Sequence, residues 1–378
     1  MGEEGGDVKE AEPSGDLDTW RKNGNPKGKE NKMMSFFRRK NIFVFACMAT
    51  IIAVAWSFST TEAEAKSYKW KISQGIAEDH PAAARCKQFA KLVGEKSEGR
   101  IKLTYFPSGA LGDWMEQIEG NRMGTLEIGL NAGSTSYDPR TNLMFMPYLF
   151  ATWDEARAAI GSKGWLTPIF DELYSSIGLK VLGIYLNAWD GMAYTKRVDK
   201  VVKTPAEYKG IKMRVPPIRI FEVYIPTLGF ISTPIAYSET FTALQTGIVD
   251  ARSACPAVEA YVMRDALKYW VATRDCFEYW FLTMNNKLWN SLSAEDQAIL
   301  TNCADKVMGD QAIAAEKDEA DFKKKLEDAG VKVYEVTQEE WEEGAKVVRE
   351  KAWPRIQEEL LGSILMEKVK AHATKISQ

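Results

Sequence analysis

The chain has 378 residues, of which 45% are hydrophobic and 27% charged; this excludes wholesale disorder and suggests about two domains. Lysine and arginine (49) nearly balance aspartate and glutamate (52), and the net charge of −3 argues against a nucleic-acid-binding protein. The 2 histidines and 5 cysteines form no cluster at zinc-ligand spacing, so the sequence predicts no metal site.

Two segments precede the folded part of the chain. Residues 1–32 are polar and lack an apolar period, so we expect a disordered leader or a mis-assigned start. Residues 33–65 begin with basic residues, continue through an apolar stretch at 42–58 and end in the A-x-A motif Ala63–Ala65, which is the order of a secretory signal peptide. An uncleaved membrane anchor is the alternative, although the stretch is marginally short for one. We expect cleavage before Lys66 and a periplasmic location.

Four cysteines follow the expected cleavage site: Cys86, Cys255, Cys276 and Cys303. An oxidising compartment permits disulfides, and four cysteines allow three pairings. Buried unpaired thiols are the alternative, and the sequence does not choose between them.

From residue 68 the chain alternates strands and helices. Tyr68–Ser73 alternates polar and apolar residues and predicts a strand, and Pro81 opens a helix with one apolar face. Further strands are expected at Ile101–Phe106, Leu126–Leu130, Lys180–Leu186, Ile211–Val215 and Ile248–Ala251, and helices at Trp114–Met123, Phe221–Leu228 and Ser238–Thr246. From Ala294 onward the pattern is mostly helical. Alternation of this kind indicates an α/β fold.

No catalytic motif is visible in the sequence. It contains no G-x-S-x-G, C-x-x-C or G-x-G-x-x-G motif and no phosphate-binding loop. We expect His80 to lie at a helix start, with a ligand contact as the alternative, and His372 to lie on a solvated helix face. The sequence therefore predicts neither an enzyme nor a cofactor.

The most informative stretch is Gly210–Pro256. A strand there runs into Pro216 and Pro217, with Arg214 near its carboxyl end. Ligands of open α/β sheets bind beyond the carboxyl ends of strands. The planar arginine fork matches a carboxylate with two parallel hydrogen bonds, and a surface ion pair is the alternative role.

Several motifs together resemble one family. They are the G-I-K-M-R-V-P of 210–216, the T-P-I-A-Y-S-E-T-F-T-A-L-Q-T-G-I-V-D of 233–250, the Y-F-P-S-G-A-L-G of 105–112, the G-T-L-E-I of 124–128 and the M-P-Y-L-F of 146–150. In this order they resemble the DctP family, the solute-binding subunits of tripartite ATP-independent periplasmic (TRAP) transporters.

The resemblance implies a fold of two α/β lobes around a cleft, the Venus-flytrap fold, which closes on its ligand by hinge bending. Lobe I is expected to comprise residues 66–190 and 280–318, and lobe II residues 191–279. The C-terminal helices of 319–378, including a long crossing helix, are expected to pack across both lobes.

The resemblance also implies site residues. Arg214 falls on the carboxylate-clamping arginine of the family, and Tyr237 falls on an aromatic wall of the cleft. Other implied positions near the ligand are Gly75, Asp113, Trp114, Asn131, Ala132 and Ser134. Trp189 is a candidate for the cleft wall, with a place in the core as its alternative.

The chain departs from the family at two positions. Ala193 stands where many relatives carry a second arginine, and the asparagine of the usual D-G-x-E-N-P is missing from the segment after Val249. Arg252 lies nearby, and we hypothesise that it supplies the second positive group. These departures leave the identity of the ligand open.

The resemblance implies an extracytoplasmic receptor that captures a small organic anion, either a carboxylate or a sulfonate, and delivers it to the integral-membrane TRAP subunits. It implies no catalytic step; a metal that bridges the ligand occurs in this family, but nothing in the sequence indicates one. The alternatives are the ligand-binding module of a sensor or another importer, and an extracytoplasmic enzyme acting on a sugar acid.

Overall fold

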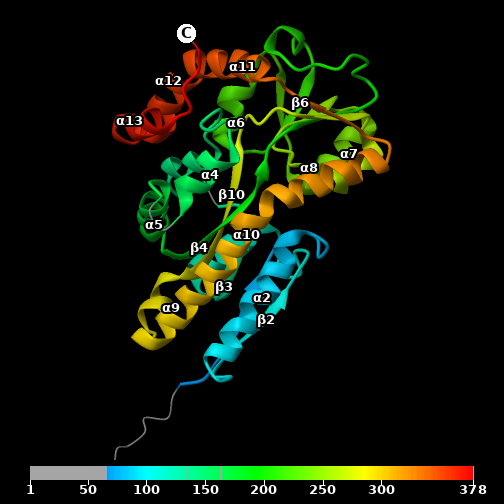
Figure 1. The fold of residues 1–378 in the computed structure, drawn as a ribbon. Helices are drawn as coiled ribbons and strands as arrows, with labels where there is room; N and C mark the ends of the chain where they lie inside the picture. The colour runs from blue at the N-terminus through cyan, green and yellow to red at the C-terminus, as the bar shows by residue number, and fades with distance from the viewer. Residues whose placement is uncertain (1–65, 134, 162–163, 378) are drawn as a thin grey trace, which may run out of the picture. The chain divides into compact units, whose positions relative to one another are not determined.

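The computed structural model describes residues 66–133, 135–161 and 164–377, which form two mixed β-sheets and the helices around them (Figure 1). The segments predicted as leader and signal peptide lie outside the described residues. This architecture confirms the α/β class that the alternating pattern predicts.

The first sheet has five strands in the order β2-β1-β3-β10-β4. Their bounds are β1 Tyr68–Ser73, β2 Ile101–Phe106, β3 Ile128–Asn131, β4 Leu179–Trp189 and β10 Phe277–Asn285. Strands β1, β2 and β3 pair in parallel, whereas β10 runs antiparallel to both of its neighbours. The carboxyl ends of β1, β2 and β3 therefore lie at one edge of this sheet.

The second sheet has six strands in the order β11-β9-β5-β8-β6-β7. Their bounds are β5 Met192–Tyr194, β6 Lys212–Val215, β7 Ile231–Pro234, β8 Ala251–Arg252, β9 Tyr269–Ala272 and β11 Lys332–Glu335. Strand β6 runs parallel to both β7 and β8, so these three strands also share an edge where their carboxyl ends meet.

Short and medium-length helices surround the two sheets. Their bounds are α2 Pro81–Lys96, α3 Trp114–Met123, α4 Trp153–Ile160, α5 Leu166–Ser176, α6 Arg219–Tyr224, α7 Tyr237–Thr246, α8 Ala257–Val262, α9 Asn286–Asn290, α11 Gln338–Lys351, α12 Trp353–Ile356 and α13 Gly362–His372. Helices α3 and α7 both end at a glycine with positive φ, Gly124 and Gly247, a conformation that glycine adopts without steric cost.

Three segments connect the two sheets. Asp190 and Gly191 join β4 to β5, and the segment 273–276 leads from β9 back into β10. The third is α10, Ala294–Asp328, whose 35 residues extend over about 50 Å. It contacts α2 and β4 on one side and α8 and β11 on the other, and Figure 1 shows it as one continuous helix between these elements. The long crossing helix expected from the resemblance is therefore present.

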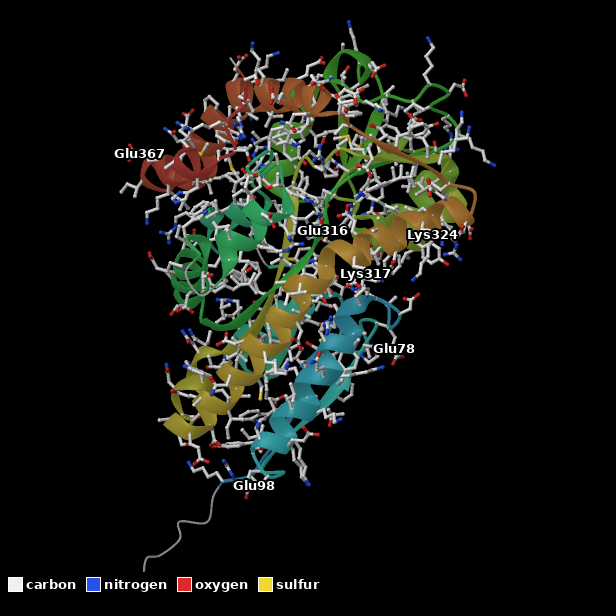
Figure 2. The ribbon with its side chains drawn as sticks, in the orientation of Figure 1. Glu78, Glu98, Glu316, Lys317, Lys324 and Glu367 are labelled. Carbon is white, nitrogen blue, oxygen red and sulfur yellow. The ribbon has the colours of Figure 1, made fainter. Side chains whose placement is uncertain are left out.

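Helix α10 has a clear polar side. Ser293 caps it by accepting a hydrogen bond from the backbone N–H of Asp296 at 3.1 Å. The charged residues Glu316, Lys317 and Lys324 of this helix are exposed, and Figure 2 labels them. Its buried side includes Leu300, Val307 and Leu326. One apolar stripe and one charged face are what a helix lying across a protein surface requires.

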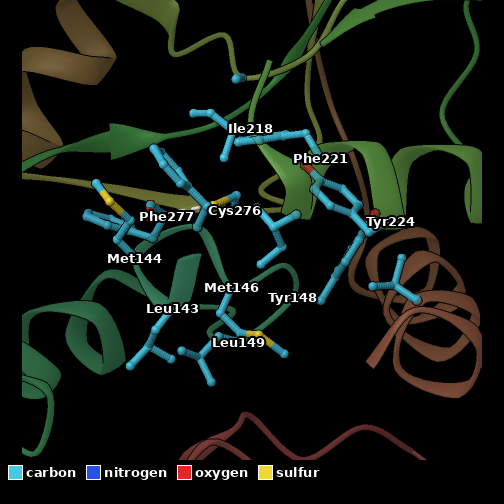
Figure 3. Close-up of a cluster of buried hydrophobic side chains, with 14 of the residues drawn as sticks. Leu143, Met144, Met146, Tyr148, Leu149, Ile218, Phe221, Tyr224, Cys276 and Phe277 are labelled. Atoms are coloured by element: carbon cyan, nitrogen blue, oxygen red, sulfur yellow. Dashed lines mark hydrogen bonds between the residues drawn. The ribbon is translucent and has the colours of Figure 1, made fainter. Parts of the chain in front are cut away.

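The largest core cluster joins residues of both sheets and of the segments between them. Figure 3 shows side chains from residues 143–149, from the segment around α6 and from the crossing at 276–277 packed against one another. Within this cluster the Tyr224 hydroxyl donates a hydrogen bond to the Asp275 carboxylate at 2.7 Å. The crossing segment is thus anchored in the core.

Most predicted elements appear close to where the pattern places them, and the differences have local causes. The expected strand Ile248–Ala251 is reduced to β8, because residues after Gly247 form a turn in which Ile248 is exposed. The expected helix Phe221–Leu228 divides into α6 and a 3₁₀ turn, since Pro226 interrupts the α-helical hydrogen bonds. The C-terminal region contains β11, which joins the second sheet.

Candidate ligand-binding site

Arg214 is held in place by the strand pairing of β6. Its backbone carbonyl accepts hydrogen bonds from the N–H and the hydroxyl of Ser253, at 3.0 and 3.2 Å. Its Nε donates to the carbonyl of Ile235 at 2.9 Å, and the residue is only 2% exposed. Within the described ranges no residue forms a hydrogen bond with its two terminal nitrogens, so that end of the guanidinium is free to bind a ligand.

The charge of Arg214 is costly in this position. Burial, followed by the nearby charge of Arg252, lowers the pKa of Arg214 to about 9. A buried cation without a counter-ion is unfavourable, and a bound anion would relieve the penalty.

Arg252 lies directly beside Arg214 in the same sheet. It is the register partner of Arg214 across β6 and of Ala193 across β5, so the small side chain of Ala193 leaves room next to it. Its terminal nitrogens donate to the carbonyl of Ala254 at 2.6 Å and to the sulfur of Met263 at 3.0 Å, while its Nε has no partner in the described part of the chain. The hypothesis that Arg252 brings a second positive group is consistent with this placement.

Both arginines line a cavity of about 500 Å³. Its walls come from both sheets, at the edges where the carboxyl ends of β1, β3, β6 and β8 lie. The lining residues are Gly75, Ile76, Ser108, Gly109, Gly112, Asp113, Trp114, Met115, Leu130, Asn131, Ala132, Phe145, Arg214, Pro216, Pro217, Ile218, Ala236, Tyr237, Ser238, Arg252, Ala254, Glu259, Glu278 and Trp280. Size, mixed lining and position beyond strand ends are typical of a small-molecule site.

The first sheet contributes Asn131 at the end of β3. Its side chain is 5% exposed, and neither its amide nitrogen nor its amide oxygen has a hydrogen-bond partner among the described residues. An unsatisfied buried amide costs free energy. A ligand with both a hydrogen-bond acceptor and a donor would satisfy the amide nitrogen and the amide oxygen.

Asp113 and Gly75 have structural roles at the cavity wall. The Asp113 carboxylate caps α3 by accepting from the N–H groups of Met115 and Glu116 at 2.8 and 3.0 Å. A Cβ atom on Gly75 would lie 3.3 Å from the Cβ of Trp114, a tight approach that favours glycine. These contacts fix the loop that carries Trp114.

The structure brings together most of the predicted site residues. Eight of them line the cavity: Gly75, Asp113, Trp114, Asn131, Ala132, Arg214, Tyr237 and Arg252. Ser134 lies outside the described residues.

Trp189 is the exception and is corrected. It is 1% exposed, packs edge-on against Phe277 with ring centroids 4.8 Å apart, and is absent from the cavity wall. It lies at the end of β4, where the chain enters the crossing, and its ring faces the core.

Glu259, Glu278 and Trp280 are among the lining residues that the sequence reasoning missed. Glu259 accepts a hydrogen bond from the Tyr237 hydroxyl, and Glu278 accepts one from the side-chain amide of Asn187. Trp280, two residues after Glu278 on β10, forms part of the wall. The available signal was a single glutamate inside the apolar run of residues 277–282.

The cysteines and histidines have no part in the cavity wall. Cys86, Cys255, Cys276 and Cys303 are all buried and unpaired, which answers the question that their spacing left open. His80 caps α2, with its Nδ1 accepting from the N–H of Ala82 at 3.1 Å, as expected. Within the described ranges no cluster of three metal-ligating side chains occurs, and no helix is both long and apolar enough for a membrane span.

A cavity between two sheets, with free guanidinium nitrogens on one wall and an unpartnered amide on the other, suits a small polar ligand that bonds both walls. The sequence pattern of the bacterial extracellular solute-binding proteins of family 7, DctP, matches residues 72–359. The chain therefore belongs to this family, as the motifs at 105–250 predicted.

Relatives and solved structures agree with this assignment. A solute-binding protein of Chromohalobacter salexigens is 28% identical over 284 residues, which are 74% of this chain and 82% of the relative. The 2,3-diketo-L-gulonate-binding periplasmic protein YiaO of Escherichia coli is 28% identical over 296 residues, 75% of this chain and 86% of the relative.

The fold is that of a sugar acid binding protein from Advenella mimigardefordensis solved with galactonate. That structure has a TM-score of 0.72 and 23% identity, with coverage of 82% of this chain and 100% of that one. A TRAP periplasmic solute binding protein from Polaromonas, bound to D-erythronate, has a TM-score of 0.73 and 24% identity, with the same coverage. These similarities confirm the two-lobed fold.

Proposed function

We propose that this chain is the periplasmic receptor of a TRAP transporter and that it captures a small organic anion through a carboxylate bound to Arg214. The observation that carries the proposal is the buried Arg214 guanidinium, whose terminal nitrogens lack a partner at the wall of a cavity of about 500 Å³. A carboxylate supplies two acceptor oxygens and the missing negative charge in one group.

The relatives favour organic acids as ligands. Proteins similar to this chain are named for 2,3-diketo-L-gulonate and C4-dicarboxylates, and structural neighbours hold glucuronate, galactonate and succinate. All of these ligands carry a carboxylate, which is the group that a buried arginine fork recognises.

Binding would draw the two lobes together. We take lobe I as residues 66–190 and 280–318, and lobe II as residues 191–279. An anion on Arg214 that also bonds Asn131 contacts both lobes, and it does so only when they are closed. This difference in affinity between open and closed states shifts the equilibrium toward closure. The hinges would be the crossing at Asp190 and Gly191 and the segment 273–276.

The closed receptor would then dock on the integral-membrane TRAP subunits and release its cargo, with no chemical step. We further propose that the signal peptide of residues 33–65 directs export, so that the exported protein begins near Lys66. Mass spectrometry of protein recovered from the periplasm would test this; a mass that includes the apolar stretch would favour the membrane anchor.

A thermal-shift screen against organic acids tests the proposed function. A ligand at 100 times its dissociation constant adds about 2.7 kcal/mol to the free energy of unfolding, which raises the midpoint measurably. We expect stabilisation by carboxylates and recovery of the bound acid unchanged by mass spectrometry. Stabilisation only by uncharged compounds, or chemical conversion of the acid, would contradict the proposal.

A further inference from the structure

Besides Asp113, which caps α3, two further carboxylates line the same cavity as the two arginines. Glu259 lies in α8 beside the second sheet, and Glu278 is the second residue of β10 in the first sheet. Capture of an anion does not require them, because a carboxylate facing an anionic ligand repels it. Because they lie on both walls, Glu259 and Glu278 indicate which groups the ligand carries besides its carboxylate.

Glu259 has one committed and one free oxygen. Its Oε2 accepts the hydrogen bond from Tyr237, whereas its Oε1 is buried and has no partner in the described part of the protein. The residue is 4% exposed. A buried acceptor of this kind requires a hydrogen-bond donor, and Tyr237 has already used its hydroxyl hydrogen.

Glu278 faces the cavity from the opposite sheet. Asn187 donates a hydrogen bond to its carboxylate from β4. Burial, opposed by that bond and by the charge of Arg252 but reinforced by the charge of Glu259, raises the pKa of Glu278 to about 7. The charge of Glu259 therefore acts on Glu278, although the two residues belong to different walls of the cavity.

Only one arginine is free to clamp a carboxylate. The terminal nitrogens of Arg252 already bond Ala254 and Met263, while those of Arg214 have no partner among the described residues. Glu259 and Glu278 add carboxyl groups to both walls of the cavity, and Asp113 adds a third. A second carboxylate on the ligand would therefore find no free fork and would meet negative charge.

On the basis of the proposed function, we infer that the ligand is a monocarboxylate that also carries an N–H or O–H donor, held by Arg214 at one group and by Glu259 and Glu278 at the other. Hydroxy acids and amino acids share this chemistry. Dicarboxylates are rejected, and Glu278 is the residue that rejects them.

A matched set of acids tests the inference. Propionate, lactate and alanine carry hydrogen, hydroxyl and ammonium at the same carbon, and succinate, malate and aspartate are their counterparts with one more carboxylate. Galactonate and galactarate provide a six-carbon pair. Dissociation constants are measured by calorimetry at pH 8, where Glu278 is ionised.

We expect each monocarboxylate with a donor to bind at least tenfold more tightly than its dicarboxylate, and propionate to bind more weakly than lactate or alanine. The lactate and alanine arms distinguish a hydroxyl from an ammonium donor. Tighter binding of the dicarboxylates would overturn this inference and leave the proposed function standing. Failure of every acid to bind would contradict the proposed function itself.

Variants assign the discrimination to its residue. Glu278→Gln removes the charge with little change of shape, and we expect dicarboxylate affinity to rise at least tenfold while monocarboxylate affinity falls. Glu350→Gln, on the exposed face of α11, is the matched control and should change neither. Glu259→Gln gives a second measurement if the first variant folds poorly. Unchanged selectivity in both cavity variants would refute the assignment.

Discussion

Replacement of Arg214 by glutamine is expected to change ligand binding and protein stability in opposite directions. The residue is 2% exposed, and its side chain forms one hydrogen bond within the described residues, from Nε to the carbonyl of Ile235. Glutamine retains a polar group of moderate size but lacks both the charge and the fork. We expect the affinity for the ligand to fall and the stability of the ligand-free protein to stay the same or rise.

The effect on binding follows from the loss of a desolvated charge pair. Truncating one partner of such a pair costs about 2–5 kcal/mol. At about 1.4 kcal/mol for each tenfold change, this loss weakens the affinity for a carboxylate ligand by roughly 30-fold to several thousand-fold. A ligand bound at micromolar concentration would then fail to bind in an ordinary titration.

The effect on the unliganded protein is different. The pKa of about 9 for Arg214 corresponds to a penalty on the order of 5 kcal/mol for keeping the buried side chain charged. The lost bond to Ile235 costs only about 1 kcal/mol. We therefore expect the ligand-free variant to unfold at the same urea concentration as the wild type or a higher one.

The assay pairs urea unfolding without ligand with calorimetry using the best acid from the screen. Arg219→Gln is the matched control, because Arg219 is exposed and forms surface ion pairs with Glu222 and Glu359. The control should keep full affinity. Unchanged affinity in the Arg214 variant would refute the clamp, and marked destabilisation without ligand would show that its guanidinium has a partner within the folded protein.

Three further predictions concern other parts of the molecule. Asn131→Leu removes an unpartnered buried amide, so the free energy of unfolding of the ligand-free protein should rise. The affinity for the acid should fall at least tenfold. Equal affinity of variant and wild type by calorimetry would show that Asn131 does not bind the ligand. Trp189→Ala should lower the free energy of unfolding by about 3–5 kcal/mol through loss of core packing and leave affinity intact, and a selective loss of affinity would contradict its core assignment. The pKa of Glu278 rises to about 7 on folding, so the folded state retains a proton that the unfolded chain releases near pH 4.5. The free energy of unfolding should therefore fall by about 3 kcal/mol between pH 4.5 and pH 7.5. Urea unfolding of Glu278→Gln over the same pH range should lack this component.

Local sequence was sufficient for much of the fold. The strands at Tyr68–Ser73 and Ile101–Phe106 and the helix at Trp114–Met123 lie within the bounds that periodicity predicts, because each has its own apolar pattern and its own stop signal. Strand β10 was missed, since the mostly apolar run at Phe277–Asn285 does not by itself distinguish a buried strand from a buried helix.

The sequence by itself predicted the class of protein, because its motifs resemble those of the DctP family, and it made Arg214 the candidate for binding the carboxylate, because that arginine stands near the end of a strand before two prolines. Only the tertiary structure decided which polar groups meet there. Arg252 becomes a neighbour of Arg214 through the register of β6 and β8, and Glu278 joins them from the other sheet. Trp189 and Trp114 carry the same indole, yet one lies in the core and the other at the cavity wall. The sequence specifies the chemistry of each side chain, whereas the fold decides which side chains meet, because it brings the edges of particular strands together.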